Sequence, residues 1–355
     1  MARDNLPTLA VVGATGAVGT VMCDLLSSRE NRFSEIRLVA SERSAGRKRS
    51  VRGEQVEVLP LSAEVFDGMD IVMFVSPDDI SRKFAPIAVA RGAVAVDNSQ
   101  VFRMDPDVPL VVPEINPEQA RYRPKGIIAN ANCTTLTMII VMAPLHAEYG
   151  LRELVVASYQ AASGAGQIGA DTLHDQLVKI AGDRSIGTRT GDIRQAVGDQ
   201  VGPFAAPLAL NVVPWAGSLK DDNWSSEELK IRNESRKILG LPDLKVSATC
   251  VRVPVVTGHS VAVHAIFGSE VSAEAARNVM RSAPGVILVD DPANGEFPTP
   301  ADAVGTDPAW VGRIRRSLDD PRALDVFISG DNLRKGAALN TLQIAELVAS
   351  EFTGS

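Results

Sequence analysis

The chain has 355 residues, of which 45% are hydrophobic and 22% charged, and this composition excludes a disordered or fibrous protein. At ~150 residues per domain, the length predicts one large domain or two of ordinary size. The formal net charge of −7 argues against a nucleic acid or an anionic membrane as partner, although a local basic pocket can still bind a phosphorylated small molecule.

The cysteine content and the length of the apolar stretches limit the class of protein further. The three cysteines are scattered and form no CxxC or Cys/His cluster, so we expect neither a disulfide framework nor a metal site. The first residues lack the apolar core of a signal peptide, and the longest apolar stretch, 136–145, is far shorter than the ~20 residues that span a bilayer. We therefore expect a soluble, cytoplasmic protein.

Short β-rich runs alternate with helical segments in the first third of the chain. The expected strands are residues 9–12, 36–40, 70–75 and 93–97. A helix is expected from the glycine-rich turn to about Ser28, and another over 80–91. Strands that alternate with helices form right-handed crossovers and a parallel sheet. This pattern predicts an α/β, Rossmann-type doubly wound domain.

The pattern changes from about residue 133. The expected elements are a long apolar helix (135–148), a strand (154–160), an irregular Gly/Pro/Arg-rich region (182–217), two β-rich runs (245–256 and 260–268) and an amphipathic C-terminal helix within 332–351. The tight connection between the β-rich runs predicts a hairpin. We expect a second, α+β domain with a mixed or antiparallel sheet, and a C-terminal helix able to pack on the first domain.

The segment from Gly13 to Gly19 is a GxxGxxG variant of the dinucleotide fingerprint. Glycines let the main chain approach a pyrophosphate, and the helix N-terminus that follows supplies free amides. At the end of the second strand, Arg43 and Ser44 offer a cation and a hydroxyl for a 2′-phosphate, whereas Glu42 opposes this interpretation. We expect NADP, although the basic run 47–49 can equally be a solvated face.

Cys133 lies at or near the N-terminus of the expected helix 135–148, within the sequence NANCTT. The helix dipole favours a thiolate at such a place. The alternative is a small buried residue near a helix cap. Cys23 lies inside a helix and Cys250 inside a β-rich run, so both are expected to be buried and inert.

A thiolate nucleophile needs a proton partner, and the chain has four histidines. A structural role is expected for His146, late in an apolar helix, and His174 belongs to another helix. His259 and His264 are five residues apart, hence on opposite faces of a regular strand. We expect His259, which follows Gly258, to be the acid/base and to be exposed at a cleft.

Three charged residues are further candidates. Arg252, flanked by valines, is either an edge-strand arginine in a salt bridge or a bidentate clamp for a substrate carboxylate. Ser225 and Glu228 fit a capping box. This leaves Glu227 and Lys230, at i and i+3, either as a surface ion pair or as a pair in a site.

Taken together, these segments resemble the aspartate-semialdehyde dehydrogenase family. The motifs that carry the resemblance span nearly the whole chain in order: GATGAVG (13–19), FRMD (102–105), VPEIN (112–116), NCTT (132–135), SYQAASGAG (158–166), EELK (227–230), RVPV (252–255), GHS (258–260) and KGAALNTLQIAE (335–346). The resemblance implies an NADP-binding domain over 1–132, completed by the C-terminal helix (331–355), and a catalytic and dimerisation domain over 133–330.

The resemblance also implies roles for single residues. Cys133 would be the acyl-thioester nucleophile, His259 the acid/base, and Gln160 the residue that orients the thioester or substrate. Arg252 would hold the substrate α-carboxylate and Glu227 its α-amino group.

Phosphoryl and cofactor contacts are implied in the same way. Arg103 and Lys230, with Asn132 nearby, would bind the phosphoryl group. The cofactor contacts would be Gly13, Thr15, Gly16, Ala17, Val18, Arg43, Ser44, Ser163, Gly164 and Gln343.

The implied reaction is the reversible, NADP-dependent reductive dephosphorylation of L-aspartyl-4-phosphate to L-aspartate-4-semialdehyde, on the route to lysine, diaminopimelate, threonine and methionine. The expected assembly is a homodimer or homotetramer, with contacts sought in 182–217. One alternative is an N-acetyl-γ-glutamyl-phosphate reductase, which Glu227 and the missing Gly-Cys-Tyr-Pro motif disfavour. Another is a non-catalytic NADP-binding sensor.

Overall fold

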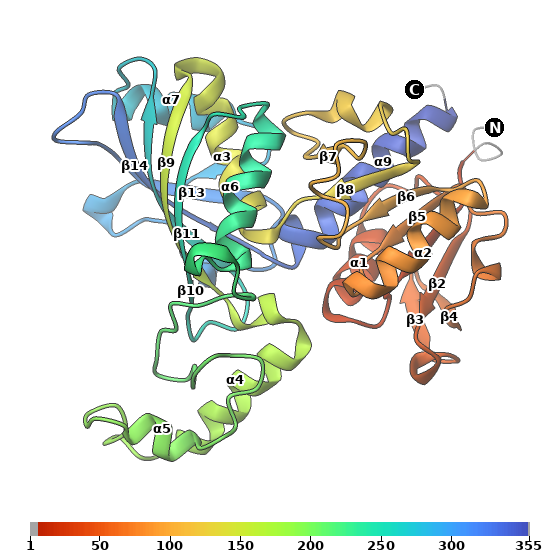
Figure 1. Cartoon of the computed structure of the whole chain (residues 1–355), viewed down its shortest axis with the longest axis horizontal. Coiled ribbons are helices and arrows are strands. Elements are labelled where there is room, and N and C mark those ends of the chain that lie inside the picture. Colours follow the sequence, from red (N-terminus) through yellow and green to blue (C-terminus); the bar gives the residue numbers. More distant parts are fainter. Residues whose placement is uncertain (1–5, 354–355) are drawn as a thin grey trace. The chain divides into compact units, whose positions relative to one another are not determined.

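The computed structural model describes residues 6–353 and divides into two units (Figure 1). Unit 1 comprises Met1–Asn132, Lys237–Gly240 and Leu333–Ser355, and unit 2 comprises Cys133–Arg236 and Leu241–Asn332. Residues 1–5, in which the sequence predicts no signal peptide, lie outside the described residues. No helix within 6–353 is long and apolar enough to span a membrane.

Unit 1 is built on an eight-stranded sheet with the order β3-β4-β2-β1-β5-β6-β8-β7. Its strands are β1 (Leu9–Val12), β2 (Ile36–Ala40), β3 (Lys48–Val51), β4 (Glu54–Pro60), β5 (Ile71–Phe74), β6 (Val94–Asp97), β7 (Leu110–Val111) and β8 (Ile127–Asn130). Only the β3–β4 pair is antiparallel among them. Because β2 and β5 flank β1, the chain winds in opposite directions from β1, and the carboxyl end of β1 is the point where a doubly wound sheet binds its ligand. The predicted Rossmann-type domain is confirmed.

Helices α1 (Ala17–Ser28) and α2 (Asp78–Ala90) follow β1 and β5. The C-terminal helix α9 (Leu339–Thr353) belongs to unit 1 and shares a hydrophobic core with α1 and the sheet, to which it contributes Leu342, Ala345 and Val348. The expected single helix within 332–351 instead begins with a π-helical turn, Arg334–Ala338. Such turns often occur at functional sites.

A buried ammonium group stabilises this turn. Lys335 is 3% exposed, and its Nζ donates to both carboxylate oxygens of Glu114, at 2.7 and 2.6 Å, and to Oδ1 of Asn340 and Oε1 of Gln343. Asn340 in turn donates to the Asn130 amide oxygen. This network ties α9 to the end of β8, and the carboxylate compensates the buried charge.

Unit 2 contains a six-stranded mixed sheet with the order β10-β9-β11-β14-β13-β12. The strands are β9 (Leu151–Gln160), β10 (Lys245–Arg252), β11 (His259–Phe267), β12 (Val286–Leu288), β13 (Ala309–Arg316) and β14 (Ala323–Gly330). Helices α3 (Cys133–Tyr149) and α7 (Ala273–Ser282) pack on the sheet. The predicted α+β arrangement with a mixed sheet is confirmed.

The predicted hairpin between the two β-rich runs is wrong. β10 pairs in parallel with β9, and β9 lies between β10 and β11. The connection 253–258 passes the end of β9, where Val253 N–H bonds to the Gln160 oxygen, and Pro254 has no N–H to give to a hairpin ladder. A turn signal such as Gly258 indicates that the chain reverses, but not which strand becomes its neighbour.

One face of the six-stranded sheet carries exposed apolar side chains. On β9, Val155 and Tyr159 are 46% and 40% exposed, whereas the alternate residues Val156 and Ser158 are buried. The Tyr159 ring packs against Phe327 of β14, with ring centroids 6.0 Å apart. A two-residue period of burial is typical of a sheet that is covered on one side only. We call this surface the open face.

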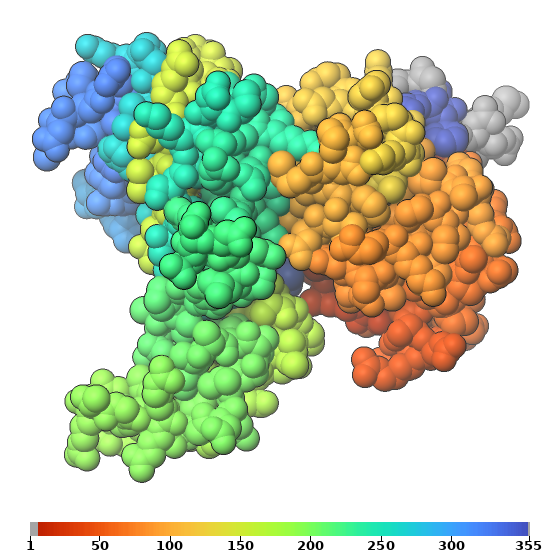
Figure 2. Space-filling model, in the orientation of Figure 1, coloured from red at the N-terminus to blue at the C-terminus, as the bar shows by residue number. Residues whose placement is uncertain are grey.

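Residues 167–217 form a lobe that projects from the rest of unit 2 (Figures 1 and 2). The lobe has its own small core and two helices, α4 (Gln167–Ile180) and α5 (Asp192–Val197). The buried side-chain oxygen of Gln176 orders its long loop by accepting from the N–H groups of Leu208 and Ala209. The expected irregular region 182–217 is therefore correct apart from α5.

We expect Lys335→Met to lower the free energy of unfolding by about 3 kcal/mol, because it leaves the largely buried Glu114 carboxylate without its cation. The double variant Lys335→Met/Glu114→Gln should recover part of this loss, since no uncompensated charge remains. Urea unfolding followed by circular dichroism measures both. Equal stability of the single variant and the wild type would contradict the stabilising role of the pair.

Candidate active site

Cys133 is the first residue of α3, and its side chain is half-buried. Its Sγ lies 3.2 Å from Nε2 of His259. The other two cysteines are buried, and burial raises the pKa of Cys23 to about 11 and that of Cys250 to about 12. Only Cys133 among the three therefore combines access, a helix N-terminus and a neighbouring imidazole.

His259 begins β11, an interior strand, and its ring is fully buried. The prediction that it is exposed at a cleft is wrong, because neighbouring strands and the Cys133 side chain surround it. Nδ1 accepts a hydrogen bond from the main-chain N–H of Ala161 at 3.0 Å. Since a main-chain N–H can only donate, the neutral ring must carry its proton on Nε2, facing the sulfur.

The environment of His259 keeps the ring neutral. Burial, and next the positive charge of Arg252, lower the pKa of His259 to about 3, against the opposing effect of the Glu227 carboxylate. At pH 7 the ring is therefore an uncharged Nε2–H donor.

Arg252 and Gly164 complete the surroundings of this ring. Arg252 is the last residue of β10, paired in register with Gln160, and is 7% exposed. Its Nη1 donates to the main-chain oxygen of Ala161 at 2.8 Å. A Cβ atom on Gly164 would lie 2.5 Å from that Nη1 and 3.2 Å from Nε2 of His259. The absence of a side chain at 164 therefore leaves room for both groups.

Gln160 ends β9 and is fully buried. Its Nε2 donates to the hydroxyl of Thr134, the residue after Cys133. Its Oε1 has no hydrogen-bond partner among the described residues. Because an unsatisfied buried amide oxygen is costly, it is a group that a bound ligand can satisfy.

Glu227 and Lys230 lie in the first turns of α6 (Ser226–Leu239). The predicted capping box is confirmed: the Ser225 N–H donates to Glu228 Oε2, and the Glu228 N–H donates to the Ser225 hydroxyl. Lys230 Nζ lies 2.6 Å from Glu227 Oε1. Because Glu227 is 8% exposed, this is not a plain surface pair.

Two residues of unit 2 near these groups have no signal in the sequence that singles them out. The peptide of Ala161 contacts both His259 and Arg252 through its main chain. Asn332, just after β14, donates to the hydroxyl of Ser163 and accepts from the N–H of Gly258. Asn332 is a buried polar residue, a property that the sequence does not show.

The glycine-rich loop of unit 1 connects β1 to α1. Gly13 has φ +92°, and a Cβ there would lie 2.3 Å from the Val75 oxygen. A Cβ on Gly19 would lie 2.2 Å from the Gly13 oxygen, whereas Gly16 meets nothing closer than 3.5 Å. Gly13 and Gly19 are therefore required by packing, and Gly16 caps α1 with no side chain to obstruct a phosphate.

The cofactor residues predicted at the ends of β1 and β2 lie close together. The Thr15 hydroxyl is 3.3 Å from the hydroxyl of Ser44. Ser44 is buried, and Arg43 beside it is exposed in the short turn Glu42–Ser44. A hydroxyl and an exposed cation thus border the loop. These donors, with the open main chain at Gly16, fit the phosphate groups of a dinucleotide.

The remaining predicted site residues are divided between unit 1 and unit 2. Arg103 and Asn132 are buried residues of unit 1, and Arg103 Nη2 donates to the Asn98 oxygen at 2.8 Å. Ser163 and Gly164 belong to unit 2, as does Lys230.

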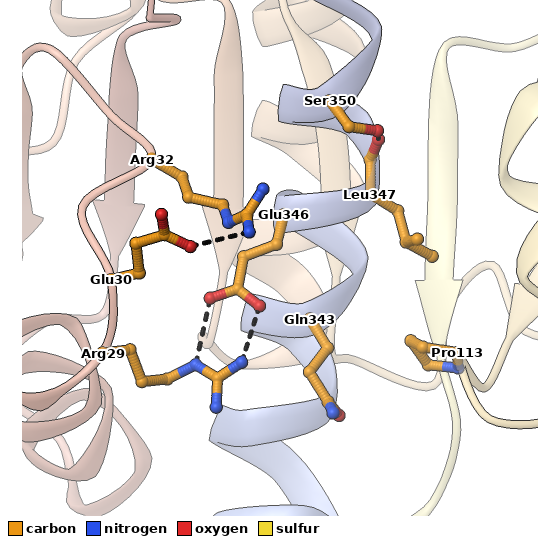
Figure 3. A pocket seen from close by; sticks show the side chains of 8 residues that line it. All are labelled: Arg29, Glu30, Arg32, Pro113, Gln343, Glu346, Leu347 and Ser350. Carbon is orange, nitrogen blue, oxygen red and sulfur yellow. Dashed lines mark hydrogen bonds and ion pairs between the residues drawn. The ribbon is translucent and has the colours of Figure 1, made fainter. Parts of the chain in front are cut away.

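Gln343 lies on α9 in unit 1. Its Oε1 accepts from Lys335, and its Nε2 donates to Glu114. It also lines a cavity of about 350 Å³ (Figure 3). Two ion pairs, Arg29–Glu346 and Arg32–Glu30, border this cavity, and the glycine-rich loop does not.

The chain is similar to known proteins over most of its length. Residues 142–335 match the family model described as semialdehyde dehydrogenase, dimerisation domain, and residues 8–122 match semialdehyde dehydrogenase, NAD binding domain. The chain is 48% identical over 350 residues to aspartate-semialdehyde dehydrogenase of Corynebacterium melassecola, covering 97% of this chain and 99% of that protein. The enzyme of the same name from Streptomyces akiyoshiensis is 48% identical over 348 residues, covering 98% and 99%.

A solved structure agrees in fold over the same extent. Aspartate semialdehyde dehydrogenase II of Vibrio cholerae, complexed with ASA, superposes with a TM-score of 0.88 at 36% identity, covering 97% of this chain and 98% of that one. With two family models that together match most of its length, and relatives of this identity and coverage, the chain belongs to the aspartate-semialdehyde dehydrogenase family.

Proposed function

We propose that the protein catalyses the reversible, NADP-dependent reductive dephosphorylation of L-aspartyl-4-phosphate to L-aspartate-4-semialdehyde through a thioester on Cys133. The observation that carries this proposal is the 3.2 Å contact between the Cys133 sulfur and the buried, neutral His259 ring. The sensor alternative does not account for this contact. Buried Glu227 favours a substrate with a free amine over an acetylated one.

Two kinds of donor stabilise a thiolate on Cys133: the amides at the start of α3 and the Nε2–H of His259. Attack of this thiolate on the acyl phosphate expels phosphate and leaves a thioester. When bound, NADPH supplies the hydride that reduces the thioester. The Nε2–H of His259 then stabilises the oxyanion of the thiohemiacetal, and collapse releases the aldehyde and restores the thiolate. The sequence predicts an acid/base role for His259. To act as a base toward the substrate, Nε2 would first have to lose its own proton, so we favour the role of a hydrogen-bond donor.

The α-carboxylate and the α-amino group of the substrate are assigned to charged side chains of unit 2. A guanidinium carries five N–H donors, so the bond from Arg252 to Ala161 leaves a fork that can pair with the substrate α-carboxylate. Glu227 binds the α-amino group, and Gln160 orients the thioester through its unsatisfied oxygen. Lys230 and Arg103, with Asn132, neutralise the phosphoryl group.

Cofactor binding is assigned to the glycine-rich loop of unit 1, and contacts from Ser163 and Gly164 stay predictions. The amides from Thr15 to Val18 hold the pyrophosphate, and Arg43 and Ser44 hold the 2′-phosphate. A contact from Gln343 stays a prediction, because its amide oxygen and one N–H are already used within unit 1.

Assembly and cellular role complete the proposal. Unit 2 serves as catalytic and dimerisation domain, and its open face, with Val155, Tyr159 and Phe327, offers apolar area to a second copy. A homodimer is proposed, with a homotetramer as the alternative and residues 182–217 as a further predicted contact region. The reaction would supply lysine, diaminopimelate, threonine and methionine synthesis in the cytoplasm.

Cys133→Ala should lower turnover at least about 10³-fold while NADPH binding is retained, because the covalent step is lost. The assay follows NADPH formation at 340 nm from aspartate semialdehyde, NADP⁺ and phosphate, and binding is measured by fluorescence. Cys23→Ala, a buried cysteine of α1, is the matched control. Substantial phosphate-dependent activity in Cys133→Ala would remove the mechanism.

Stability should fall as the pH is lowered from 6.5 toward 3, because the unfolded His259 takes up a proton near pH 6.5 that the folded ring, with a pKa of about 3, does not bind. The contribution is on the order of 5 kcal/mol. Denaturant unfolding at pH 7 and pH 4 should show a smaller loss for His259→Asn than for the wild type. His174→Asn, at an exposed histidine of α4, controls for the loss of an imidazole; an identical pH effect in all three proteins would refute the assignment.

Arg43→Ala should raise the KM for NADP⁺ about tenfold or more and leave the KM for NAD⁺ nearly unchanged, because one charge-assisted bond to the 2′-phosphate is lost. Arg47→Ala, beyond the turn Glu42–Ser44, should change neither value. A wild-type preference for NAD⁺, or an equal effect of both variants, would argue against this NADP site.

A further inference from the structure

The turn that carries Arg103 is folded around the ammonium group of Lys237. Lys237 Nζ donates to the main-chain oxygens of Arg103, Asp105 and Val108, each at 2.7 Å. All four residues belong to unit 1. An ammonium group carries three N–H donors, which matches three acceptors drawn from one short turn.

A second lysine contacts the same turn from outside. Lys125 Nζ lies 2.6 Å from Asp105 Oδ2 and 3.4 Å from Asp107 Oδ2. The hydrogen bond from Lys125 lowers the pKa of the Asp105 carboxyl, yet the lysine side chain is 44% exposed. Exposed pairs of this kind contribute little to structure, because water replaces either partner.

The contacts of Lys237 differ in kind from those of Lys125. Its acceptors are main-chain carbonyls, and Val108 is itself buried. Removing the donor would take away the ammonium group that joins these three oxygens, which weakens the fold of the turn. The main-chain course of residues 103–108 therefore depends on Lys237 and not on Lys125.

We propose that Lys237 is a positioning residue for phosphoryl binding. It fixes the main chain from which the Arg103 side chain extends, while the bond from Arg103 Nη2 to the Asn98 oxygen fixes the guanidinium. The inference rests on the proposed function, in which Arg103 binds the phosphoryl group. It adds that the direction of Arg103 is set by a lysine that does not itself contact phosphate.

The test compares KM values of the intact enzyme in the phosphate-consuming direction. Lys237→Met should raise the KM for phosphate about tenfold, and leave the KM for NADP⁺ and for aspartate semialdehyde within about twofold. Lys125→Met, the matched control on the same turn, should leave all three within about twofold. Lys237→Gln, which keeps an N–H donor, gives the same comparison with a smaller effect if the methionine variant does not fold.

Arg103→Ala distinguishes a failure of the proposed phosphoryl site from a failure of the proposed role of Lys237. If Arg103→Ala leaves the KM for phosphate unchanged, the proposed phosphoryl site is wrong and the role of Lys237 falls with it. If Arg103→Ala raises that KM but Lys237→Met does not, the inference is overturned and the proposed function stands. An equal rise in all three KM values for Lys237→Met, with a lower unfolding midpoint, would show that Lys237 is merely structural.

Discussion

The site in unit 2 depends on one peptide group, that of Ala161. Its N–H donates to Nδ1 of His259 and its oxygen accepts from Nη1 of Arg252. The first bond fixes the imidazole tautomer and the second fixes the guanidinium. Because both bonds come from the main chain directly after β9, the strand itself sets the position of the two side chains.

This arrangement places a buried imidazole beside a guanidinium, and both burial and the guanidinium charge favour the neutral form of the ring. Burial and the Arg252 charge act in the same direction on its pKa. Glu227 acts in the opposite direction but does not reverse the result. A neutral donor facing a sulfur suits chemistry in which negative charge moves between a thiolate and an oxyanion, since the same N–H can serve both.

The sequence predicts those parts of the fold that depend on local patterns. The alternating strands of unit 1, the N-terminus of α3 at Cys133 and the capping box at Ser225 follow from periodicity and capping chemistry. The insertion of β9 between β10 and β11, in place of a hairpin before His259, was not predictable, and neither was the burial of that ring, which depends on the same strand order. The Ala161 peptide has no sequence signature, since every residue has a main chain.

The glycines of the loop 13–19 and of the motif 158–166 also show what a sequence motif leaves undetermined. A Cβ on Gly13 or Gly19 would strike the main chain, so these residues are required by the packing of the loop. A Cβ on Gly164 would instead strike the side chains of Arg252 and His259. Both kinds of glycine look alike in a motif. A substitution at Gly164 would therefore disturb the carboxylate clamp and the imidazole before any cofactor is bound, so a loss of activity there cannot by itself be assigned to the dinucleotide.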